Sequence, residues 1–119
     1  IAGGKLCLLL LSRDGRERFL LDVQRGRIDL RKGTYQTRAK ATIPLLRIDF
    51  GGAPHTNPDG ESVPTPHIHR YREGFGDKWA TPLPDGFCDN PTDPWSLLQG
   101  FYAVGTIVEP PVIRQGLFT

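Results

Sequence analysis

The chain has 119 residues, 38% of them hydrophobic and 24% charged, with a formal net charge of +2. This size and balance are typical of one folded domain, so we expect residues 1–119 to form a single domain. We expect no membrane span, because the longest apolar run covers only residues 6–11. We also expect no disulfide framework, because only two cysteines are present. We therefore expect a cytoplasmic protein with no membrane partner. The sequence contains no methionine and starts at Ile1, so we expect the natural N-terminus to lie upstream.

The first fifty residues predict an antiparallel meander. Apolar runs at 6–12 and 18–24 flank a turn at 13–16, a pattern typical of a hairpin. Alternating side chains predict further strands at 34–40 and 43–50.

Residues 51–94 contain six glycines and eight prolines, which predict a long loop around short strands at 67–73 and 78–83. Asp93 and Pro94 then have the pattern of a helix start, and apolar residues at helical spacing predict a helix up to about Val108. The fold class predicted from these elements is α+β, a mostly antiparallel sheet of five or six strands with one C-terminal helix packed on it.

The strand predicted at 67–73 is unusual because it carries titratable side chains. His67 and His69 share one face, which continues with Tyr71 and Glu73. A structural interpretation is that the rings are buried and bonded to main-chain groups of the proline-rich loop. The functional interpretations below place a site here instead.

The preferred functional interpretation is metal-independent cleavage of RNA. This reaction needs a base for the 2′-hydroxyl, an acid for the leaving oxygen and cations for the charge on phosphorus. The expected catalytic residues are His67, His69, Tyr71, Glu73 and Lys78. The basic half of the chain, which has eleven basic and five acidic residues in 1–50, would hold flanking phosphates. The expected RNA-binding residues are Arg70, Arg72, Arg38 and Lys40. No cofactor is needed in this interpretation.

A metal site is one alternative. Two imidazoles at this spacing can share one transition-metal ion if further ligands arrive, and His55, Asp59 and Glu73 are candidates. If a metal is present, we expect it on His55, His67 and His69. The spacing of His67, His69 and Glu73 resembles the first half of the cupin signature, but the second half needs a downstream histidine that this chain lacks.

A non-catalytic protein-binding module is the other alternative. The loop would present Tyr71, Phe75 and Trp79 together with Arg72 to a protein partner, and these residue types are enriched at binding hot spots.

The block Pro66-His67-Ile68-His69-Arg70-Tyr71-Arg72-Glu73-Gly74-Phe75-Gly76-Asp77-Lys78-Trp79-Ala80 is distinctive. Together with segments 49–55 and 57–61 it resembles a domain-of-unknown-function family of small bacterial and prophage proteins. The resemblance covers about residues 43–84 and carries no established activity. Small bacterial proteins of this kind often lie beside DNA-binding regulators, which suggests by analogy a toxin with an antitoxin-like partner. The sequence thus favours a toxin-like ribonuclease.

Overall fold

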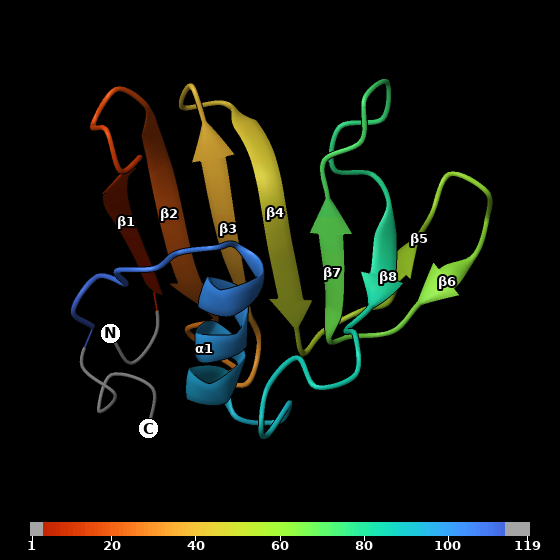
Figure 1. The fold of residues 1–119 in the computed structure, drawn as a ribbon. Helices are drawn as coiled ribbons and strands as arrows, with labels where there is room; N and C mark the ends of the chain where they lie inside the picture. Colours follow the sequence, from red (N-terminus) through yellow and green to blue (C-terminus); the bar gives the residue numbers. More distant parts are fainter. Residues whose placement is uncertain (1–3, 114–119) are drawn as a thin grey trace.

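The computed structural model describes residues 4–113, which form a six-stranded antiparallel sheet, a small two-stranded ribbon and one helix (Figure 1). The order of the strands in the sheet is β1-β2-β3-β4-β7-β8, and β5 pairs with β6 in the separate ribbon. The strands are β1 (Gly4–Leu11), β2 (Arg18–Arg25), β3 (Gly33–Ala39), β4 (Ile43–Phe50), β5 (His55–Thr56), β6 (Ser62–Val63), β7 (His67–Arg70) and β8 (Ala80–Pro82). The α+β prediction, with five or six strands and a C-terminal helix, is confirmed.

The helix α1 (Pro94–Val104) begins where the sequence predicts. The Asp93 carboxylate accepts hydrogen bonds from the main-chain N–H groups of Trp95 and Ser96, which satisfies donors that a helix leaves unpaired at its start. The predicted end near Val108 is wrong, because Thr106 has a φ of 55° and the amide of Ile107 bonds back to the Tyr102 carbonyl, which ends the helix after Val104. In the described part of the chain, no helix is long and apolar enough to cross a membrane.

The core lies between α1 and one face of the sheet (Figure 1). Leu21 and Val23 of β2, Tyr35 of β3 and Ile48 of β4 are fully buried there beside Phe101. Because side chains alternate along a strand, the residues between them point to the opposite face, which α1 does not cover. The neighbours of Ile48 on that opposite face are Arg47 and Asp49.

The second half of the sheet carries the predicted histidine strand. β7 pairs with β4, and Ile48 lies opposite Ile68 in the register. β7 ends at Arg70 and not at residue 73, since the chain turns at Gly74 and Gly76, whose φ angles of 84° and 62° favour glycine. His67, Ile68 and His69 are all buried, so this strand is buried on both faces.

Candidate metal centre

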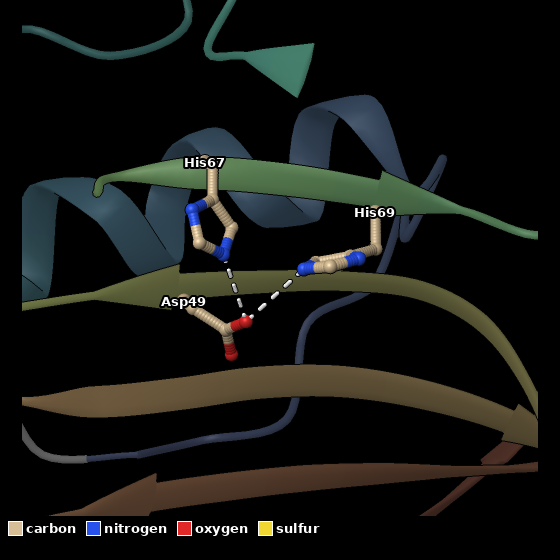
Figure 2. A group of neighbouring side chains, drawn as sticks. All are labelled: Asp49, His67 and His69. Atoms are coloured by element: carbon tan, nitrogen blue, oxygen red, sulfur yellow. Dashed lines mark hydrogen bonds and ion pairs between the residues drawn. The ribbon is translucent and has the colours of Figure 1, made fainter. Parts of the chain in front are cut away.

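Three side chains converge on the face of the sheet opposite α1: Asp49 of β4 and His67 and His69 of β7 (Figure 2). The register places Asp49 opposite His67 and Arg47 opposite His69. The Oδ2 atom of Asp49 lies 3.1 Å from Nε2 of His67 and 3.2 Å from Nε2 of His69. Antiparallel pairing of β4 with β7 therefore brings two imidazoles onto one carboxylate oxygen.

The other nitrogen of each ring is held by a main-chain carbonyl. Nδ1 of His67 lies 3.2 Å from the Val63 carbonyl and 3.3 Å from that of Pro64, and Nδ1 of His69 lies 2.8 Å from the Asp77 carbonyl. A carbonyl oxygen can only accept, so we assign the proton of each neutral ring to Nδ1. The Nε2 lone pairs of both rings then point at Asp49. Nε2 of His69 is buried, and its contact with Asp49 lacks hydrogen-bond geometry.

Asp49 is ionised in this environment. Burial alone would raise the pKa of its carboxyl, but the contact with His69, the charge of Arg47, the hydrogen bond from Thr34 and the contact with His67 together outweigh it and hold the pKa well below its usual range. The Thr34 hydroxyl donates to Oδ1 over 2.9 Å, and Nε of Arg47 lies 3.3 Å from Oδ2. Arg47 also pairs with Asp77 over 2.7 Å, so its charge is shared between two carboxylates.

His55 covers the cluster without joining it. Its ring lies 4.6 Å from the His69 ring and 5.9 Å from the His67 ring, centre to centre. Its Nε2 is 2.7 Å from the Lys78 carbonyl. The three histidines expected as metal ligands are thus neighbours. The third group that meets the Nε2 atoms of His67 and His69, however, is Asp49 and not His55.

The remaining residues expected to be catalytic lie outside this cluster. Tyr71, Glu73 and Lys78 are exposed in or beside the turn between β7 and β8. Lys78 contacts the histidines only through its main-chain carbonyl, which lies beside Nε2 of His55. Asp59, the other acidic candidate for a metal ligand, is exposed in the turn of the β5–β6 ribbon, where its carboxylate accepts from the amide of Glu61.

The residues expected to bind RNA are not gathered on one surface. Arg70 is exposed at the end of β7. Because side chains alternate along a strand, it lies on the same face of the sheet as Ile68, which is the α1 side. Arg38 lies on the opposite face and forms an ion pair of 2.6 Å with Asp22. Lys40 is exposed in the turn after β3. Arg72 stacks on Trp79, with its guanidinium carbon 4.5 Å from the ring centre.

Comparison with known proteins gives one match. The model of a family of unknown function, DUF6978, matches residues 2–107. The chain belongs to that family. No curated protein and no solved structure matches this DUF6978 member.

Asp49 is the member of the candidate site that sequence reasoning missed in this DUF6978 protein. Its position in the alternation of β4, between buried Ile48 and buried Phe50, already places it on the face away from the core. What the sequence does not indicate is that β4 has β7 as its neighbour, because the β5–β6 ribbon lies between them in the chain. Among the described residues of the DUF6978 protein, Asp49, His67 and His69 offer ligand atoms that all lie within 4.8 Å of one another.

Proposed function

We propose that this DUF6978 protein binds one divalent transition-metal ion through Asp49, His67 and His69. The observation that carries the proposal is the convergence of three electron-pair donors, two buried imidazole nitrogens and one half-buried carboxylate oxygen, on one point. Donors that face one another repel unless a cation or a proton lies between them.

The second shell supports a metal. Ligating histidines nearly always donate their other ring N–H to a carbonyl or carboxylate, which fixes the tautomer and turns the free nitrogen toward the ion. Both His67 and His69 meet this condition through carbonyls of the surrounding loops. The same bonds also agree with the structural interpretation of buried rings, in which protonated Nε2 atoms would pair with Asp49 in place of a metal ion.

The two distances from the imidazole nitrogens to Asp49 are also compatible with a metal ion. Ligands about 2.0–2.1 Å from one ion in tetrahedral or octahedral geometry lie about 2.8–3.4 Å from each other. The two nitrogen-to-oxygen distances are 3.1 and 3.2 Å.

Two histidines and one carboxylate are the ligand set of open zinc sites and of mononuclear iron(II) sites, in which the remaining positions take water or substrate. Three ligands in the described part of the chain therefore favour a centre of the catalytic type over a closed structural one. The net charge of the site is also compatible with a cation, because the guanidinium of Arg47 is shared by two carboxylates, Asp49 and Asp77.

The ribonuclease and protein-binding hypotheses stay predictions. Attack on RNA requires the histidines to reach a 2′-hydroxyl and a leaving oxygen, whereas His67 and His69 are only 2% and 0% exposed. The geometry therefore gives metal binding the better support.

Calorimetric titration of the metal-free protein with Zn²⁺ tests the proposal. We expect one ion per chain, and binding at least about tenfold weaker in Asp49→Asn and His69→Ala. Asp49→Asn keeps the shape of the side chain, and circular dichroism would show whether each variant is folded. Asp59→Asn and Glu73→Gln are matched controls, because they remove the acidic residues outside the cluster and should leave the affinity unchanged.

A wild-type protein that binds no Zn²⁺, or a folded Asp49→Asn protein that binds it as tightly as the wild type, would refute the proposal. Cleavage of single-stranded RNA by the metal-free protein, lost in Lys78→Ala, would support the ribonuclease hypothesis instead.

A further inference from the structure

An open hollow of about 360 Å³ lies directly beside the cluster. Asp49, His55 and His67 line it, so two of the three proposed ligands face this space. The hollow also includes Lys32 and the pair Gly51 and Gly52. A molecule in the hollow would thus meet the open side of a metal ion, together with a lysine.

Lys32 is available to a ligand. Its side chain is exposed, and no salt bridge to it is found within residues 4–113. The Asp29 carboxylate interacts with Lys32 only as a nearby charge and is already paired with Arg31 at 3.1 Å. The charge of the Lys32 ammonium is therefore not neutralised by a direct partner.

The loop after β4 is shaped around the Lys32 side chain. Gly51 and Gly52 have φ angles of 64° and 84°, which favour glycine. A Cβ atom on Gly51 would lie 2.9 Å from Cγ of Lys32, and one on Gly52 would lie 3.0 Å from its Cε. The two glycines thus let the aliphatic part of Lys32 pack across the loop at the wall of the hollow.

We propose that the hollow binds a small anion, a carboxylate or phosphate compound, with one oxygen on the metal and another paired with Lys32. This inference rests on the proposed metal centre. Within the site, Arg47 and Lys32 balance Asp49 and Asp77, so a divalent ion leaves the hollow positively charged. A volume of about 360 Å³ suits a compound of metabolite size.

Visible absorption of the Co²⁺-loaded protein tests this, because the spectrum of Co²⁺ responds to a new ligand. The probes are succinate, inorganic phosphate and the uncharged succinamide, each titrated into wild type, Lys32→Met and Lys5→Met. We expect at least one anion to change the spectrum saturably, while succinamide does not. The anion should bind about tenfold more weakly to Lys32→Met, with Co²⁺ affinity unchanged. Lys5→Met removes an exposed lysine of β1, outside the hollow, and should behave as wild type.

The two anions separate the two chemical sources, since a response to succinate alone indicates a carboxylate site and a response to phosphate alone indicates a phosphate site. If Co²⁺ binds but neither anion changes the spectrum, or if Lys32→Met binds the anion as well as the wild type, this inference is wrong and the metal proposal stands. If the wild type binds no Co²⁺, both fail.

Discussion

Removal of the Asn57 side chain should loosen the cover over the candidate site. Asn57 is 5% exposed and lies beside the outer edge of β8, the last strand of the sheet. Its amide donates to the Ala80 carbonyl over 2.9 Å, and its carbonyl accepts from the Ala80 amide over 2.8 Å. The side chain thus takes the place of a further strand and fastens the β5–β6 ribbon, which supplies His55 and the Val63 carbonyl to the cluster.

The size of the effect follows from these two bonds. Each contributes about 0.5–1.5 kcal/mol net, and Asn57→Ala also leaves two buried main-chain groups of Ala80 without partners. We therefore expect the free energy of unfolding to fall by about 2–4 kcal/mol.

Urea denaturation followed by circular dichroism measures this loss, with Thr56→Ala as the control in the same ribbon. Hydrogen exchange should also speed up at the amides of β5, β6 and β8 before it does so in β2 and β3. A loss below about 0.5 kcal/mol, no larger than that of Thr56→Ala, would refute the role given to Asn57.

Three further outcomes are expected. Gly100→Ala should destabilise the protein by about 1–3 kcal/mol in urea denaturation, because the new Cβ would lie 2.4 Å from the Phe87 carbonyl oxygen; a gain in stability, as helix propensity alone predicts, would contradict this. Burial raises the pKa of Asp22, but hydrogen bonds from Arg38 and Gln36 and the charge of Arg38 together lower it by more. These contacts should therefore stabilise the fold above about pH 4 and lose this effect as the pH falls through the folded pKa. The difference in urea midpoint between wild type and Asp22→Asn should therefore shrink from pH 7 to pH 3, and a constant difference would contradict it. Zn²⁺ at a hundred times its dissociation constant should stabilise the wild type by about 2.7 kcal/mol and raise its Tm by several degrees. An equal rise in the Tm of Asp49→Asn would show that the ion binds at another place.

The sheet could be predicted where the pattern is local. The continuous apolar run at 6–12 predicts a strand that the structure places at Gly4–Leu11, and β4 spans the predicted 43–50. The hydrophobic pattern and the tight turns of such strands are local features of the sequence, so these strands can be predicted without knowing which distant strands they pair with. The strand predicted at 67–73 was too long because the turn at Gly74 and Gly76 ends the pairing with β4 after Arg70.

The site could be predicted only in part. His67 and His69 stand out in the sequence because two histidines two residues apart in a strand share one face. Asp49 does not stand out, because its relation to His67 arises from long-range pairing of β4 with β7. Burial of the rings likewise depends on the ribbon and on the Asp77 turn, which cover a strand with an otherwise polar face.

Anomalous diffraction at the zinc absorption edge, from crystals of the Zn²⁺-loaded protein, tests the metal centre most directly. The account predicts one strong peak about 2.0–2.2 Å from Oδ2 of Asp49 and from Nε2 of His67 and His69. Crystals without a peak at this point, or with zinc bound only at surface histidine or carboxylate groups, would contradict it.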